Sequence, residues 1–183
     1  GNKHLQCWGV PGYSDEDLEK RGENPTQIPV GEVELVTLKD TTMTVVDKAG
    51  AIYSDSTYQF LKEPKKINLG KVKWVKGGGS FGSALLPSGQ VVLWTRDWSK
   101  PGEVLKMNLS GLADAVSVAQ DSSTVCAVRK SGKVGCVGFS YRTFEKKDAI
   151  KPTSPVEVPG ITDGVSIAGE SGDMCILRKT GDV

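Results

Sequence analysis

The sequence has very little histidine, no long hydrophobic run and almost no net charge. His4 is the only histidine among 183 residues, which excludes catalytic or metal sites built from two or more histidines. No apolar run approaches the ~20 residues of a membrane-spanning helix, and no signal peptide is expected within the given sequence, although one could already have been removed. Because 23 basic and 22 acidic side chains leave a net charge of +1, no overall field favours a nucleic-acid partner.

An internal repeat organises the chain. Four similar strings, each centred on a turn glycine, recur about every 39 to 49 residues, at Gly50, Gly89, Gly132 and Gly181. Alternating apolar residues flank each glycine, which is the period-2 pattern of paired strands. A further apolar anchor precedes each glycine by fourteen residues, at Val36, Val75, Val118 and Ile167. Each unit is therefore expected to contain at least three strands.

This period predicts an all-β protein, a β-propeller of about four blades. No window carries the sustained i, i+3, i+4, i+7 apolar spacing of a helix. We expect one domain over 1–183, with units at roughly 10–56, 57–95, 96–138 and 139–183, the last unit also taking 4–9.

The four cysteines occupy matching places in the repeat. A three-residue hairpin loop ending at Gly132 places Cys126 opposite Cys136, within reach of a disulfide. Cys175 holds the same place as Cys126, and Cys7 holds the same place as Cys136. The N-terminal strand is thus expected to complete the last blade through a Cys7–Cys175 disulfide, either within one chain or by strand exchange between two chains.

Other uses of these thiols remain open. A zinc site needs closely spaced ligands such as C-x2-C, and this sequence has none, so no metal is expected. Free buried thiols are an alternative. The disulfide interpretation implies an oxidising compartment, extracellular or periplasmic.

The string HLQCWG, with its Cys-Trp-Gly, resembles the regulator-of-chromosome-condensation repeat, and the resemblance extends over all four units. The sequence is most similar to bacterial secreted versions with a cysteine pair across each hairpin. Elsewhere the Trp-Gly pair is replaced, for example by Trp94-Thr95 and Val137-Gly138. The resemblance implies a propeller, which in this family usually has about seven blades. Similar bacterial propellers include inhibitors that bind a β-lactamase through a face of loop aromatics.

Three other patterns are weak candidates for sites. GGGSFG at 77–82 lacks the Lys-Ser/Thr of a phosphate-binding loop, which favours structural glycines. The acidic stretch 15–23 lacks the D-x-D-x-D-G spacing of a calcium loop. The lysine-rich stretch 62–76 could bind an anionic polymer, but its alternation with Val and Trp is typical of an exposed strand face.

Aromatic residues recur in the connections that follow each hairpin. Such side chains are frequent at protein-binding hot spots and also stack on sugars, whereas the structural alternative is packing between blades. The candidate binding residues are Tyr13, Tyr58, Phe60, Trp98, Tyr141 and Phe144.

We therefore expect a binding module without enzymatic activity or cofactor, secreted or periplasmic, that recognises a protein through loops on one face. A glycan-binding, lectin-like propeller is the alternative. The polar neighbours of the aromatics, such as Ser14, Gln59 and Arg142, do not match between units, which favours a protein partner.

Overall fold

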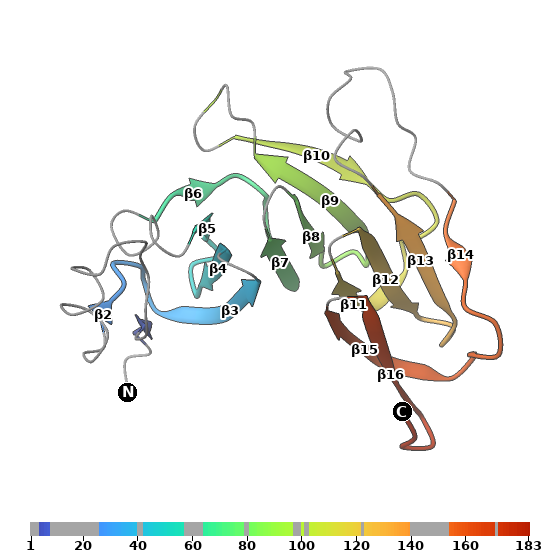
Figure 1. Cartoon of the computed structure of the whole chain (residues 1–183). Helices are drawn as coiled ribbons and strands as arrows, with labels where there is room; N and C mark the ends of the chain where they lie inside the picture. The colour runs from blue at the N-terminus through green and yellow to red at the C-terminus, as the bar shows by residue number, and fades with distance from the viewer. Residues whose placement is uncertain are drawn as a thin grey trace.

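The protein forms an open arc of antiparallel sheets (Figure 1). The computed structural model describes residues 4–7, 26–39, 42–56, 64–78, 81–96, 100, 103–121, 123–139, 154–170 and 172–183. Within these ranges all regular elements are strands. No helix there is long and apolar enough to cross a membrane.

Three sheets have four strands each, and the last has two. The first sheet contains β3 (Val33–Lys39), β4 (Thr42–Asp47), β5 (Ile52–Ser56) and β6 (Lys66–Ile67). The second contains β7 (Trp74–Gly78), β8 (Phe81–Leu85), β9 (Val91–Arg96) and β10 (Val104–Asn108). The third contains β11 (Ala115–Gln120), β12 (Thr124–Arg129), β13 (Val134–Gly138) and β14 (Val156–Glu157). The last sheet consists of β15 (Gly164–Glu170) and β16 (Asp173–Arg178).

The predicted hairpin turns are confirmed. All four turn glycines have positive φ, between 81° and 93°, a region that L-residues with a Cβ rarely adopt. The chain reverses at each one, between the second and third strands in the three complete sheets. The four recurring strings are therefore four copies of one local structure.

The core lies between neighbouring sheets, as radial blades require. Val46 of the first sheet packs with Val75 of the second, Leu85 of the second with Val118 of the third, and Val128 of the third with Ile167 of the last. Each anchor predicted from the repeat thus packs against the preceding sheet, except the anchor of the first sheet, which is Val36.

The N-terminal strand does not complete the last sheet. β1 (Gln6–Cys7) instead pairs with β2 (Thr26–Gln27), and we call these two strands the N-terminal ribbon. Leu5 and Ile28 hold the ribbon against Val45 in β4, so its apolar contacts anchor it at the first sheet. The prediction that the N-terminal strand closes the ring within one chain is therefore wrong.

Candidate binding site at the inner strands

All six predicted aromatic binding residues, Tyr13, Tyr58, Phe60, Trp98, Tyr141 and Phe144, lie outside the described residues. Their role remains a prediction. The acidic stretch 15–23 lies outside as well.

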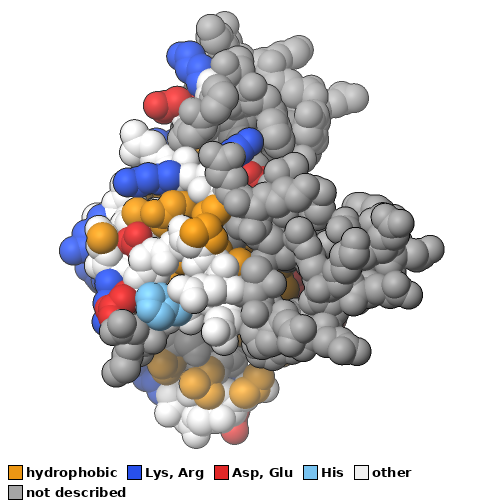
Figure 2. Space-filling model, turned by 90° about the vertical axis from the view of Figure 1, so that its left-hand side faces the viewer, with side chains coloured by type: hydrophobic (Ala, Val, Ile, Leu, Met, Phe, Trp, Pro, Cys, Tyr) orange, Lys and Arg blue, Asp and Glu red, His pale blue; other side chains and the backbone are white. Residues whose placement is uncertain are grey.

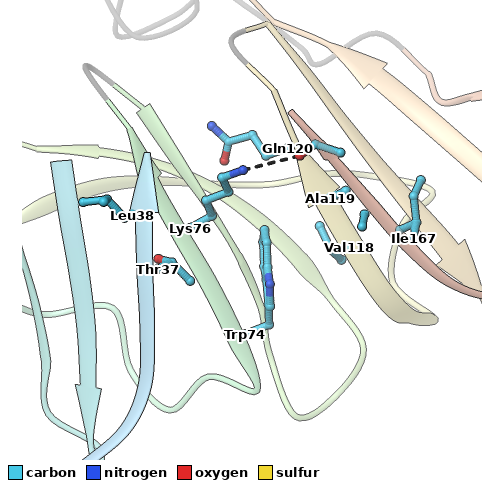
Figure 3. Close-up of a pocket in the computed structure, with 10 residues that line it drawn as sticks. Thr37, Leu38, Trp74, Lys76, Val118, Ala119, Gln120 and Ile167 are labelled. Atoms are coloured by element: carbon cyan, nitrogen blue, oxygen red, sulfur yellow. Dashed lines mark hydrogen bonds between the residues drawn. The ribbon is translucent and has the colours of Figure 1, made fainter. Parts of the chain in front are cut away.

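A cavity of about 320 Å³ opens where the first strands of the four sheets converge (Figure 3). β3 contributes Thr37 and Leu38, β7 contributes Trp74 and Lys76, and β11 and β15 form the opposite wall. The four strands occupy equivalent places in the repeat. Because each of them contributes lining residues, the cavity forms only where the four sheets come together.

Lys76 connects sheets that are not neighbours. Its Nζ donates a hydrogen bond to the Gly169 carbonyl at 3.4 Å and lies 3.6 Å from Oε1 of Glu170. The lysine comes from β7 and both partners belong to β15, so the side chain links the second sheet directly to the last. Only 12% of the Lys76 side chain is exposed, compared with 53% for Lys48 and 47% for Lys133 in their ion pairs.

Two hydrogen-bonding groups in the cavity wall are buried without a partner among the described residues. They are Oε1 of Gln120, whose residue is 1% exposed, and Oγ1 of Thr37. Figure 3 shows the Gln120 amide and the Lys76 ammonium directed toward the same part of the cavity. Because a buried acceptor without a partner costs free energy, a ligand group that donates a hydrogen bond to Gln120 would be favoured here.

The sequence analysis did not identify this cavity. A usable signal was present in the column two residues after each anchor, which holds Leu38, Gly77, Gln120 and Gly169. Gln120 is the one polar side chain in that column. A polar residue in an otherwise apolar or glycine column marks a position that packing alone does not explain.

The glycines of the stretch 77–82 have a structural reason. Gly77 and Gly82 pair across β7 and β8, and the Trp94 indole packs over both. A Cβ on Gly82 would collide with this indole. Gly77 and Gly82 therefore admit a buried tryptophan, as the structural interpretation of these glycines predicted.

The cysteines confirm one predicted disulfide and correct the other. Cys126 and Cys136 are directly paired across β12 and β13 and form a disulfide, with Cα atoms 4.1 Å apart. Cys175 in β16 is free and exposed. The predicted Cys7–Cys175 bond within one chain is therefore wrong, because Cys175 is free and the β1–β2 pair is not joined to β15 and β16.

The described part of the lysine-rich stretch, residues 64–76, does not direct all its lysines to solvent. Lys65, Lys66, Lys71 and Lys73 are exposed, whereas Lys76 turns into the cavity. Among the residues that the structure describes, no three His, Cys, Asp or Glu side chains are placed to hold a metal ion. The described inner-strand groups are suited to hydrogen bonding and ion pairing.

Comparison with known proteins identifies the fold. No family model matches the sequence, and no curated protein matches it. Among solved structures, yeast RCC1 (Prp20) bound to Kap60 superposes over 98% of this chain with a TM-score of 0.68 and 14% identity. Human WBSCR16 gives 0.68 over 98% with 15% identity, and the N-terminal domain of Nup159 gives 0.54 over 86% with 12%.

The protein therefore has a β-propeller fold of the RCC1-like repeat type. The chain spans about half the length of these relatives: 51% of Prp20 and 54% of WBSCR16. At such low identity the likeness shows the fold alone.

Proposed function

We propose that this protein is a binding module without enzymatic activity, and that it recognises a protein partner through the aromatic connections and the inner-strand cavity. The observation that carries the proposal is the RCC1-like fold over 98% of the chain. Solved structures of this type include Prp20 bound to Kap60, and Prp20 is described with binding properties toward Gsp1p and histones.

The inner-strand groups support a peptide-like contact. A backbone N–H or an Asn, Arg or Lys side chain of a partner could donate to Oε1 of Gln120, which has no partner among the described residues. Trp74 offers an apolar wall of the same cavity. Large aromatic side chains such as the six predicted ones contribute strongly at protein interfaces.

We also propose that the protein works in an extracellular or periplasmic compartment. The Cys126–Cys136 disulfide supports this, since such bonds persist mainly in oxidising environments. Alkylating the protein in its native source before extraction, followed by mass analysis of the peptides, tests the proposal. Alkylated Cys126 and Cys136 would contradict it.

The binding proposal is tested by isolating a cross-linked partner and measuring its Kd for purified variants. Replacing Trp98 or the pair Tyr141 and Phe144 with alanine should weaken binding by roughly 30-fold, the effect of losing a hot-spot residue. Gln120→Leu fills the same space without the acceptor and should also weaken binding. The exposed Lys65→Ala is the control.

Two outcomes would overturn the proposal. One is a Kd that none of the aromatic variants changes. The other is binding that a free glycan abolishes and that deglycosylation of the partner removes, which would establish the lectin alternative.

A further inference from the structure

The two ends of the chain carry complementary halves of one sheet. In the N-terminal ribbon Cys7 is opposite Thr26, just as Cys136 is opposite Val156 between β13 and β14. The adjoining backbone bonds also correspond: Ile28 N to Leu5 O at 3.0 Å, and Val158 N to Val134 O at 2.9 Å. The ribbon therefore has the register of a third and a fourth strand.

The last sheet supplies the opposite half. β15 and β16 pair with the same register and the same bulge as β11 and β12, so that Cys175 is opposite Ala168 as Cys126 is opposite Ala119. In the third sheet β13 then adds to β12 and presents Cys136 to Cys126. Among the described residues no strand adds to β16, so Cys175 lies on an open edge.

Both ends also expose an apolar surface that is covered in every internal sheet. At the N-terminal end Val36 is 41% exposed, whereas its repeat equivalents Val75, Val118 and Ile167 are at most 7% exposed. At the C-terminal end Leu177 is 41% exposed, whereas Val46, Leu85 and Val128 are at most 5% exposed. In the interior the first group packs against the preceding sheet and the second against the following one.

The two halves cannot meet within this arc. Figure 1 places the ribbon at one end of the arc and β16 at the other. Figure 2, which views the N-terminal end, shows hydrophobic side chains gathered on the described part of that face. The whole chain superposes on 51% of a Prp20 chain and 54% of a WBSCR16 chain, so two copies together have about the length of one such chain.

We propose that two copies of this chain join head to tail into a closed ring. β15 and β16 of one copy and the ribbon of the other form one composite four-stranded sheet, and Leu177 of the first copy packs against Val36 of the second. The same contact recurs at the other junction, so the ring closes with two-fold symmetry and leaves no open edge.

This geometry places Cys175 of one copy opposite Cys7 of the other. With oxidised glutathione as the oxidant, the two thiols lose two protons and two electrons and form one disulfide, while glutathione disulfide is reduced to two thiols. The disulfide would link the two copies covalently at the junction, so that its detection reports the contact.

The first test uses the 183-residue protein at two isotopic compositions. Unlabelled and 15N-labelled chains are mixed, oxidised with glutathione disulfide and analysed by sedimentation and by peptide mass. We expect a species of twice the 19.5-kDa chain mass and Cys7–Cys175 peptides that join a light to a heavy chain. A monomer at all concentrations, or peptides joining only chains of one label, would overturn the proposal.

The second test compares two exposed leucines. Leu177→Lys places a charge in the proposed junction and should weaken dimer formation by about tenfold or more, because the charge must be desolvated. Leu105→Lys, at a position on β10 that is 43% exposed, is the matched control and should leave the dimer unchanged. Equal effects of the two substitutions would also contradict the proposed junction, and circular dichroism of both variants checks that they fold.

Discussion

The third sheet and the last sheet have nearly the same hairpin in very different surroundings. In both, an arginine Nε lies 2.8 Å from an aspartate Oδ1 fifteen residues earlier, in the pairs Arg129–Asp114 and Arg178–Asp163. The lysine after each arginine donates its backbone N–H to the same aspartate's carbonyl at 3.0 Å. Yet β12 is almost wholly buried, whereas β16 alternates between exposed and half-buried residues.

The comparison separates local geometry from burial. The hairpin forms the same turn and ion pair whether or not neighbouring strands cover it, so these features come from the local sequence. The burial of β12 comes from β13 and from the last sheet, which pack on it. A substitution should therefore change the free energy of unfolding by different amounts in the two hairpins where the side chain contacts a neighbouring strand or sheet. It should change it by the same amount where the side chain contacts only its own hairpin.

The largest difference is expected at the turn glycines. Gly132 and Gly181 have φ of 84° and 90°, so alanine is strained equally at both. An added Cβ at Gly132 would also collide with the Thr162 carbonyl, whereas nothing lies within 4 Å at Gly181. Gly132→Ala should lower the free energy of unfolding by about 3 kcal/mol and Gly181→Ala by about 1 kcal/mol, measured by urea unfolding. Equal losses would show that the inter-sheet contact is unimportant.

The disulfide gives the next effect. In a background with Cys7→Ser and Cys175→Ser, the double change Cys126→Ala and Cys136→Ala should lower the free energy of unfolding by roughly 2.5 kcal/mol, as expected for a short closed loop. Cys175→Ser alone should change it by less than about 0.5 kcal/mol in the monomer, because this side chain is exposed. Adding reductant to the background protein should reproduce the larger loss, and no response to reductant would contradict the prediction.

A core truncation tests burial directly. Val128 is 0% exposed, and its equivalent Leu177 is 41% exposed. Val128→Ala should lower the free energy of unfolding by about 2 kcal/mol through lost contacts and a cavity, and Leu177→Ala by less than about 1 kcal/mol in the monomer. Thermal and urea unfolding of both variants measure the difference. A larger loss from Leu177→Ala would mean that this side chain is covered in solution.

The smallest effect should be the same in both hairpins. The Arg129–Asp114 and Arg178–Asp163 pairs are all partly exposed, so double-mutant cycles should give a coupling below about 1 kcal/mol for each. Agreement within about 0.5 kcal/mol is expected, because the two pairs share one local geometry. Coupling in the third sheet alone would show that burial reaches this pair.

The position of Cys7 shows which features of a strand the sequence predicts and which it does not. Its place in the repeat predicts a third strand, and the register opposite Thr26 agrees. The same pattern cannot identify which sheet edge the strand joins. The spacing in the repeat would be the same whether that edge belonged to the last sheet of the same chain or to the last sheet of another copy. Gln120 was missed for a related reason: a single polar residue in a strand shows its burial only once four sheets have converged.

The sequence by itself determined the repeat, the four glycine turns, the strands beside them and the Cys126–Cys136 disulfide, because each depends on residues close together in the chain. Tertiary structure alone decided that the N-terminal ribbon packs on the first sheet and not on β16, and that Lys76 and Gln120 line one cavity. These features depend on how much apolar surface of each sheet its neighbours bury. That quantity is a property of neighbouring sheets and not of any single repeat.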